Sequence, residues 1–527
     1  MNSDPSTERT MNMGAFTFPG VYTQEQDFSL YIPSLTTMTL GIVTTASKGP
    51  VDTLTLVTTE EQLINMFGFP GAQFKGLLAA QQYLRKGNQL WIVRVAGYDE
   101  ATATLDLQNA ADNAVAVSLT ASSSGSWANG STGLSAEVIA GNYAGTYTIR
   151  LRWNGYLVET FDNVKMNPST DADFIETRMA SSSYASAVAV TGQTDLKLVS
   201  ATTFSGGDDG AGVSAADYVG TTVGGVKTGL KLFLDPRVVD VNTLAVPGID
   251  DATVISEIIS ICETRQDCFG LVDPPFGLDA TQIVDWHNGV LGGSATYPAS
   301  TLNSSYAGLF WPWCRVFDSF HNESVWAPPS GFAAQQFAFT DQFYDTWFAP
   351  AGFRRGQLSQ VLETEYVPTD GEGNYLYGGR AGLAGVNAVN PIMSFVGQGT
   401  FLWGQRTLQR SPTATDRINV RRMLLFLRKV IATATMYLTF EPNDEQMWDD
   451  FKGLVIPFLR TVKSGRGLRD YRVIMDETTN PPSLVDQNEA LGRILLKPTK
   501  AAEIININFG LLPQGANFDE FVTNTVA

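Results

Sequence analysis

An abrupt change in residue composition and periodicity divides this chain. From about Tyr98 to Phe204, Ala, Ser, Thr and Gly dominate and few long helical patterns occur. Within this stretch Tyr147–Trp153 alternates polar and apolar residues, Asn154-Gly155 is a typical hairpin turn, and Tyr156–Thr160 supplies the answering strand. Because helix and strand patterns lie on both sides, the sequence predicts a β-rich domain inserted into an α/β domain.

The α/β pattern is clearest after the insert. Residues 231–234 predict a strand, 252–264 a helix with one apolar face, and 268–272 a second strand. Such a βαβ unit predicts parallel strands covered by helices. Further strands are predicted at 40–45, 54–58, 90–95 and 306–313, and helices at 60–67 and 75–85.

The last third of the chain carries the strongest helical patterns. Apolar residues from Val420 to Leu438 recur every three or four positions and predict one buried stripe. A second helix is predicted to begin after Asn443-Asp444, with a kink at Pro457. Residues 503–509 alternate apolar and polar side chains, which predicts a half-buried strand followed by a loose tail.

The expected fold class is therefore mixed α/β and multidomain. The first stretch is polar and lacks periodicity, which is typical of an arm that a partner orders. We expect an N-terminal arm, a central α/β domain in two pieces, an inserted β-rich domain, an α+β domain and a C-terminal arm. Their ranges, in that order, are 1–27, 28–97 with 206–365, 98–205, 366–502 and 503–527.

Composition narrows the function. The 527 residues suffice for several domains, and 44% hydrophobic with 17% charged residues is typical of a folded globular protein. A net charge of −18 argues against broad nucleic-acid binding, which needs clustered Lys and Arg. Because the sequence shows no signal peptide and no apolar run of membrane-spanning length, we expect it to stay in the cytoplasm that makes it, without direct membrane contact.

The sequence offers little support for an enzyme. A Ser/His/Asp triad would have to use His287 or His321, and neither lies in a catalytic motif. No Gly-x-Ser-x-Gly elbow and no phosphate-binding Walker pattern occurs. We therefore expect no catalytic residue and no cofactor.

Metal binding and disulfides are also unexpected. Cys262, Cys268 and Cys314 are too few and too irregularly spaced for a zinc site or a disulfide framework, and we interpret them as reduced core residues. Asp208 and Asp209 lie in a Gly-rich loop that could hold a cation, but a polar turn is the commoner explanation. No metal site is expected.

Several fragments of the chain resemble a known family. They include Phe18-Pro19-Gly20-Val21-Tyr22, Phe204-Ser205-Gly206-Gly207-Asp208-Asp209-Gly210, Trp311-Pro312-Trp313 and Phe440-Glu441-Pro442-Asn443. The others are residues 46–50, 67–68, 90–95, 327–331, 349–352, 385–387, 402–408 and 418–422. In this order, over nearly the whole chain outside the insert, they are similar to the contractile tail sheath proteins of phages and related injection machines. The family often has Ala-Arg-x-Asp where residues 337–341 read Phe-Ala-Phe-Thr-Asp.

The resemblance implies a structural subunit without enzymatic activity. Many copies would form a helical sheath around a tail tube protein, with baseplate and tail terminator proteins at the ends. Contraction would drive the tube through the host envelope, and the protein would belong to the virion tail after assembly in the host cytoplasm. The implied architecture has a subtilisin-like α/β core, an outward insert and a tube-facing C-terminal domain. The sheath of a pyocin-like or secretion-type device and a subtilisin-like hydrolase are the alternatives.

In the family, both terminal arms add strands to the sheets of neighbouring subunits. Strand addition needs an extended segment with free backbone groups and alternating side chains. We expect the donated residues to be Phe18, Val21, Tyr22, Ile505, Ile507 and Phe509. The alternative is that these segments are ordinary edge strands within one subunit.

A basic stretch interrupts this acidic chain. Between Asp416 and Arg472 there are eleven Lys and Arg against seven Asp and Glu. We expect Lys463, Arg466 and Arg469 to face an acidic tube surface through ion pairs weak enough to break on contraction. The alternative is a solvated helix end with favourable dipole pairing.

Overall fold

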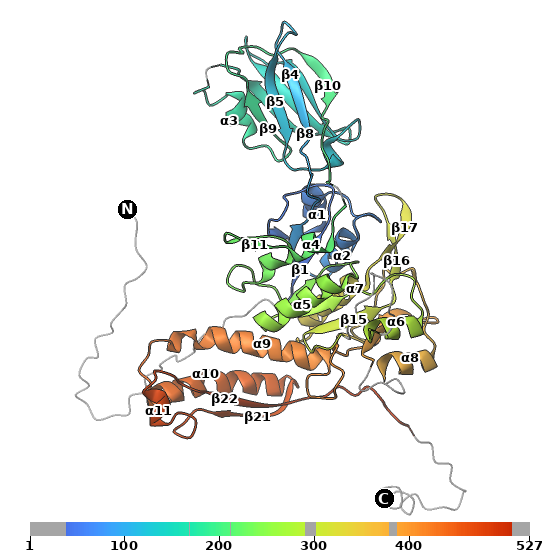
Figure 1. Ribbon diagram of the computed structural model, residues 1–527, viewed down its shortest axis with the longest axis vertical. Coiled ribbons are helices and arrows are strands. Elements are labelled where there is room, and N and C mark those ends of the chain that lie inside the picture. The colour runs from blue at the N-terminus through green and yellow to red at the C-terminus, as the bar shows by residue number, and fades with distance from the viewer. Residues whose placement is uncertain (1–37, 168, 211, 290–301, 379–386, 508–527) are drawn as a thin grey trace, which may run out of the picture.

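The computed structural model describes residues 38–167, 169–210, 212–289, 302–378 and 387–507. Three parts follow one another in Figure 1: a β domain at the top, an α/β domain in the middle, and a long pair of helices with a β-hairpin at the base. Phe18, Val21, Tyr22 and Phe509 lie outside the described residues, so their proposed strand donation stays a prediction.

The middle part is built on an eight-stranded sheet of order β2-β3-β1-β13-β14-β15-β19-β20. The six inner strands pair in parallel, and the two outermost strands pair antiparallel to their neighbours. The strands are β1 (Thr39–Thr44), β2 (Thr55–Val57), β3 (Gln89–Arg94), β13 (Thr243–Ala245), β14 (Phe269–Val272), β15 (Ala307–Trp311), β19 (Val389–Phe395) and β20 (Gly399–Leu402). This confirms the predicted mixed α/β fold class and its parallel strands.

Helices cover both faces of this sheet. On one face, Leu40 and Ile42 of β1 pack with residues of α2 and α7, whereas Val43 faces α5 on the other side. The helices are α1 (Glu60–Phe67), α2 (Lys75–Leu84), α4 (Ala215–Val219), α5 (Ala252–Arg265), α6 (Ala280–His287), α7 (Pro329–Phe343) and α8 (Asp370–Tyr377). A small sheet joins β16 (Cys314–Asp318), β17 (Glu323–Ala327) and β18 (Glu363–Thr364), and β11 (Thr222–Val223) pairs with β12 (Val226–Lys227).

The strand predicted at residues 231–234 is wrong. Residues 231–233 belong to a 3-10 helix, η2 (Gly229–Phe233), and residue 234 caps its end. The helix opens at Gly229 with a left-handed φ of 52°. The buried ring of Phe233 packs against the position of Gly41 in the sheet. A short apolar run fits a buried helical turn as well as a buried strand, because both present apolar residues to the core. The βαβ unit is instead formed by β13, α5 and β14.

The β domain consists of two sheets that enclose a separate core. Strands run in the orders β10-β6-β7-β8 and β4-β5-β9. The elements are β4 (Thr104–Gln108), β5 (Val115–Ala121), η1 (Ser126–Ala128), β6 (Leu134–Ala140), β7 (Tyr147–Trp153), β8 (Tyr156–Val164), α3 (Ile175–Met179), β9 (Ala185–Ala189) and β10 (Val199–Thr203). The predicted β7–β8 hairpin is confirmed, and Asn154 and Gly155 both have the positive φ that its turn requires.

The base of the molecule contains the two predicted long helices. They are α9 (Ile418–Thr435), which continues into η3 (Met436–Leu438), and α10 (Glu445–Ser464), which begins at an Asp444 cap and contains Pro457. A hairpin of β21 (Leu468–Ile474) and β22 (Arg493–Pro498) packs on them, with α11 (Pro482–Val485) in its connection. Among the described residues, no helix is both long and apolar enough to cross a membrane.

Candidate polymerisation interface

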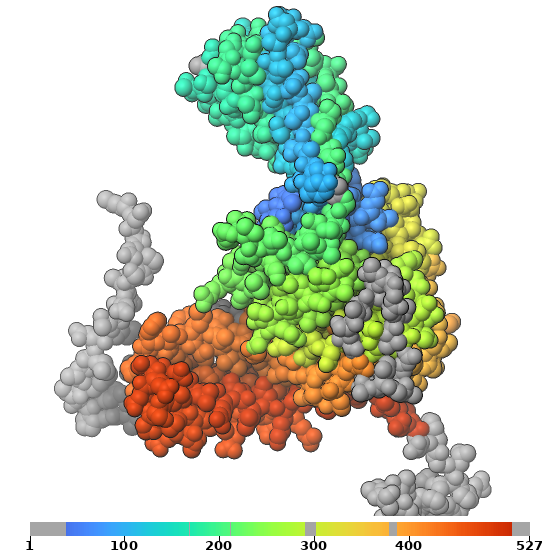
Figure 2. Space-filling model, viewed as in Figure 1, coloured from blue at the N-terminus to red at the C-terminus, as the bar shows by residue number. Residues whose placement is uncertain are grey.

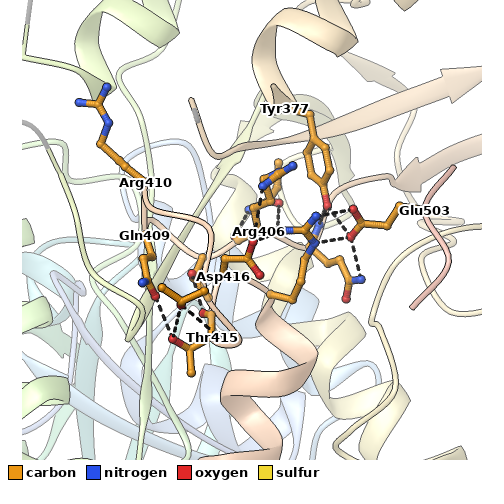
Figure 3. A network of polar contacts seen from close by, with 12 residues as sticks. Tyr377, Arg406, Gln409, Arg410, Thr415, Asp416 and Glu503 are labelled. Carbon is orange, nitrogen blue, oxygen red and sulfur yellow. Dashed lines mark hydrogen bonds and ion pairs between the residues drawn. The ribbon is translucent and has the colours of Figure 1, made fainter. Parts of the chain in front are cut away.

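The C-terminal arm leaves the subunit through a clamp on Glu503. Both carboxylate oxygens accept hydrogen bonds from Arg417, at 2.6 Å from Nε and 2.8 Å from a terminal nitrogen. Gln405 Nε2 and the Tyr377 hydroxyl each donate to Oε1 at 3.0 Å. Figure 3 shows Glu503 directed into this group of side chains. A two-point Arg–carboxylate pair fixes direction as well as distance, so the clamp sets where the arm begins.

Each clamp residue is positioned by a different element. Tyr377 is the last residue of α8, Gln405 lies in the loop after β20, and Arg417 is the residue before α9. Arg406 stacks on the Tyr377 ring with its guanidinium carbon 4.5 Å from the centroid, and Asp416 holds Arg417 at 2.8 Å. The sequence alone did not point to this clamp, because Tyr377, Gln405 and Arg417 precede Glu503 by 126, 98 and 86 positions and no spacing rule connects residues so far apart.

The clamp also determines the charge of Glu503. Burial by itself would raise the pKa of this carboxyl group. The hydrogen bonds and charge of Arg417, together with the hydrogen bonds from Gln405 and Tyr377, outweigh burial and hold the Glu503 pKa below its ordinary value. Glu503 is therefore ionised, and its ion pair with Arg417 is intact, at neutral pH.

Beyond Glu503 the described chain is mostly apolar and exposed. Ile504, Ile505 and Ile507 are 82%, 76% and 70% exposed, and the described residues from 503 to 507 form no strand. The prediction of a half-buried strand within the subunit is therefore wrong for this part. The reason is physical: alternation shows that a segment suits a sheet, but a neighbouring strand must be available before the sheet can form.

The arm lacks a neighbouring strand, whereas the β21–β22 hairpin is a sheet with room for more strands. Tyr471, Val473, Ile494 and Leu496 point toward α9 and α10 but are only half-buried. In the described part of the chain this sheet has two strands, so both of its edges carry unpaired backbone groups. A two-stranded sheet is marginal by itself and gains stability from added strands.

The three predicted basic residues lie around the turn between α10 and β21, and we call them the basic turn. Lys463 is in the last turn of α10, Arg466 is in the connection, and Arg469 is in β21. Lys463 Nζ lies 3.0 Å from a carboxylate oxygen of Asp470, while Arg466 and Arg469 are exposed. The Trp347 indole donates to the Gly465 carbonyl at 2.7 Å and holds the turn against the helices. The Lys463–Asp470 pair corresponds to the solvated helix end that we considered, and contact with a tube stays a prediction.

Of the residues weighed for catalysis or metal binding, His287 is fully buried, whereas His321 and Asp209 have polar partners. Burial, with a smaller contribution from Arg410, lowers the pKa of His287 to about 3, so its imidazole is neutral. His321 Nδ1 lies 2.6 Å from Asp318 in the β16–β17 turn. Asp209 accepts hydrogen bonds from the Ser126 backbone and hydroxyl. Within the described ranges, no group of three His, Cys, Asp or Glu side chains is placed to hold a metal ion.

The β domain is fastened to the middle part by two buried cations. Arg94, 1% exposed, donates to the carbonyls of Ala46, Gly49 and Ser124 at 2.9, 2.7 and 2.9 Å. Lys48 donates to the Asn65 carbonyl at 2.9 Å. Its ammonium also lies 4.5, 4.8 and 4.1 Å from the ring centroids of Trp127, Trp153 and Tyr184 in the β domain. These contacts join the two parts directly.

With this architecture described, comparison with solved structures identifies the class of fold. The crystal structure of the sheath tail protein from Desulfitobacterium hafniense matches with a TM-score of 0.60 at 11% identity, over 87% of this chain and 94% of that one. The sheath of PVC, an extracellular contractile injection system, in its contracted state matches with a TM-score of 0.54 at 16% identity, over 94% and 98%. The fold is that of the sheath proteins of contractile tails and injection systems.

Sequence comparison identifies the relatives more closely. Residues 410–511 match the family model of the phage tail sheath C-terminal domain. The tail sheath protein of Vibrio phage KVP40 is 31% identical over 403 residues, which cover 71% of this chain and 56% of that protein. The chain therefore spans little more than half the length of this curated relative. It is related to the contractile tail sheath proteins of phages, as its sequence fragments predicted.

Proposed function

We propose that this chain is the structural subunit of a contractile tail sheath. Copies polymerise helically around a tail tube, remain linked by strands lent from their terminal arms, and contract to drive the tube through the host envelope. The observation that carries the proposal is the apolar segment after Glu503. It is clamped at its root, exposed beyond it, and belongs to a subunit whose β21–β22 hairpin has two open edges.

Strand addition explains both the exposed apolar arm and the open edges of the hairpin. An extended segment gains backbone hydrogen bonds on an open edge, and its alternating apolar side chains cover what the acceptor leaves exposed. Residues 504–507 and the predicted N-terminal residues Phe18, Val21 and Tyr22 are the donors, and the hairpin edges are the acceptors. A subunit would then complete its small sheet only inside the polymer, which favours long assemblies over monomers.

The segments expected from the sequence enter this proposal with one change: β19 and β20, expected in the 366–502 domain, belong to the central sheet. The β domain, at the opposite end of the molecule from α9 and α10 in Figure 1, projects outward, and the C-terminal part faces the tube. Tube, baseplate and terminator proteins are the partners, with no direct contact to nucleic acid or membrane. The assembled protein belongs to the virion tail and forms in the host cytoplasm. The comparisons with sheath proteins support a structural role, and we propose no catalytic activity.

Electron microscopy of the purified chain tests polymerisation. The full chain should form hollow tubes, whereas Ile504→Ser/Ile505→Ser/Ile507→Ser should stay folded and monomeric. The control Val188→Ser/Val223→Ser/Val226→Ser makes the same change at exposed positions elsewhere and should leave the tubes intact. Tubes from the Ile variant, or from chains lacking residues 1–22 or 500–527, would contradict strand donation by the arm concerned.

A docking assay tests the basic turn. Replacing Lys463, Arg466 and Arg469 with Ala should weaken tube binding at moderate salt, because exposed ion pairs contribute about 0–1 kcal/mol each. Replacing the exposed Arg85, Arg178 and Arg237 removes the same charge elsewhere and should change nothing. Unchanged docking of the first variant would contradict a tube-facing role. Capsid and terminase genes beside this one would favour a phage over another injection device.

A further inference from the structure

An exposed apolar patch lies at the end of the helical pair. Met436, Tyr437 and Phe440, in the connection between α9 and α10, are 70%, 78% and 102% exposed. Three large apolar side chains exposed within five residues are unusual for a surface that stays in water. We call Met436, Tyr437 and Phe440 the tip patch. The end of the molecule that carries it is the orange-red region at the lower left of Figure 2.

Phe440 is held outward by its backbone. Its φ is +75°, in the left-handed region that aromatic residues rarely adopt, while its side chain makes no use of the subunit's core. The residue opens the Phe440-Glu441-Pro442-Asn443 fragment that the sequence analysis singled out.

A groove lies next to the tip patch. It has a volume of about 850 Å³. Asn443, three residues after Phe440, lines it, together with Trp448, Pro481, Pro482 and Val485. These side chains give it an apolar floor. The tip patch ends three residues before Asn443, so the patch and the groove lie close together at one end of the C-terminal part.

The rim of the groove is acidic. Asp444, Glu445, Glu477 and Asp486 line it, and its lining contains no Lys or Arg. A partner must therefore present apolar side chains flanked by positive charge.

The chain itself carries such a surface. On the outer face of the hairpin, Arg472 lies directly opposite Leu495, and Arg493 and Lys497 follow on the same face of β22. All four side chains are exposed, and Leu495 is 57% exposed. We call these four residues the basic hairpin face. Asp470, opposite Lys497, lies on the same face and pairs with Lys463 at 3.0 Å. The face still has more positive than negative charge around Leu495, so in a chain of net charge −18 it is the natural complement of an acidic, apolar groove.

We propose that the tip patch and groove of one copy bind the basic hairpin face of a second copy. This inference rests on the proposed function and specifies one contact of the polymer. The two surfaces are different, so the contact is heterologous. Repeating it generates a ring or an open helix, depending on the rotation between copies, rather than a closed dimer. It uses the outer face of the hairpin and leaves both hairpin edges free for the arms.

Charge reversal and restoration test the pairing in the full chain. Glu477→Lys/Asp486→Lys and Arg472→Glu/Arg493→Glu should each raise the concentration needed for polymerisation at least about tenfold, equivalent to about 1.4 kcal/mol. Mixing the two variants should restore polymerisation, because each then finds an opposite surface on the other. Glu61→Lys/Asp370→Lys is the control with the same charge change on other exposed residues and should behave like the unaltered chain.

Each outcome has one meaning. Normal polymerisation of both reversed variants overturns the inference and leaves the proposed function intact, whereas an unaltered chain that never polymerises overturns the proposed function itself. Two folded but inactive variants that do not restore each other overturn the pairing. Circular dichroism checks folding, and Phe440→Ser, which removes the apolar contact from a fully exposed position, should weaken polymerisation without any change of charge.

Discussion

The β domain and the β21–β22 hairpin are both antiparallel, yet they differ in completeness. In the β domain two sheets of four and three strands face each other and bury Val117, Ile149 and Leu151 completely. In the hairpin two strands cover part of a helical surface, and Tyr471 and Leu496 stay half-buried. The β domain therefore completes its core within one subunit. The hairpin leaves apolar surface half-buried and two edges open within the single subunit.

The two ends of the molecule are also attached differently. The β domain is held by several buried groups, including Arg94 and Lys48, whose partners lie in both parts. The arm is held at one residue, Glu503, and is exposed immediately afterwards. A broad junction suits a domain that moves as a rigid body, whereas a single clamp leaves an arm free to reach another subunit.

The largest expected effect is a difference in unfolding free energy between core substitutions in the β domain and in the β21–β22 hairpin. Leu151→Ala should cost the β domain about 2 to 5 kcal/mol, because it leaves a cavity in a closed core. Leu496→Ala should cost the unassembled chain about 1 kcal/mol or less, because the side chain is already half in water. Denaturant unfolding below the polymerisation concentration measures both.

In assembly, Leu496→Ala should have the larger effect of the two substitutions. Leu496→Ala should raise the concentration needed for tubes, since strands added to the hairpin would bury Leu496, and Leu151→Ala should not. Equal effects of the two changes on unfolding and on assembly would remove the distinction between the closed and the open sheet.

The next largest effect is expected from a substitution at the junction between the β domain and the middle part. Arg94→Met leaves the Ala46, Gly49 and Ser124 carbonyls without their donor in a buried site, at a cost of about 3 kcal/mol. Limited proteolysis should then cut the connections near Gly97 and Gly207 faster than in the unaltered chain. Arg85→Met, at an exposed position, is the matched control. Unchanged cleavage would show that Arg94 does not hold the junction.

The arm clamp should give a local effect. Glu503→Gln removes the charge from the Arg417 pair and should speed hydrogen exchange of residues 500–507 without changing global unfolding. The Glu503 pKa is lowered in the folded chain, so the clamp's contribution is present above the unfolded pKa and is lost as pH falls through the folded value. Acid should therefore release the arm in the unaltered chain, and an arm equally protected at every pH would contradict the clamp.

Lys48→Met should show the smallest effect. Lys48→Met keeps most of the side-chain volume among the three aromatic rings, so unfolding should change by less than about 1 kcal/mol, whereas Lys48→Glu should be severe. Burial lowers the Lys48 pKa from 10.5 to about 8. Between these values the unfolded chain binds a proton that the folded chain has lost, so this group makes stability rise with pH there. A falling stability over that range, absent in Lys48→Met, would contradict this.

Local patterns predicted most elements well. Helix α1 occupies the predicted residues, α2 and β3 lie within one residue of expectation, and the Asn154-Gly155 hairpin is confirmed. In each case neighbours in sequence carry the signal: a cap, a turn or a periodic apolar face. The error at residues 231–234 arose where an apolar run was too short to distinguish a strand from a helical turn.

The site was predicted only in part. The exposed Ile505 and Ile507 were singled out from their alternation, and the basic turn from its charge, both of which are local properties. The clamp of Arg417, Tyr377 and Gln405 on Glu503 was missed. Those residues come from three elements that meet only after the central sheet and the helices have packed.

By itself, the sequence determined the fold class, the interruption by a β domain, the two long helices and the resemblance to sheath proteins. All of these follow from composition, periodicity and residue order. Only the tertiary structure decided where the arm is anchored, that residues 504–507 stay unpaired, and that an acidic apolar groove and a basic hairpin face lie on one subunit. These properties depend on which distant residues share a surface and on which edges and side chains the packed subunit leaves uncovered.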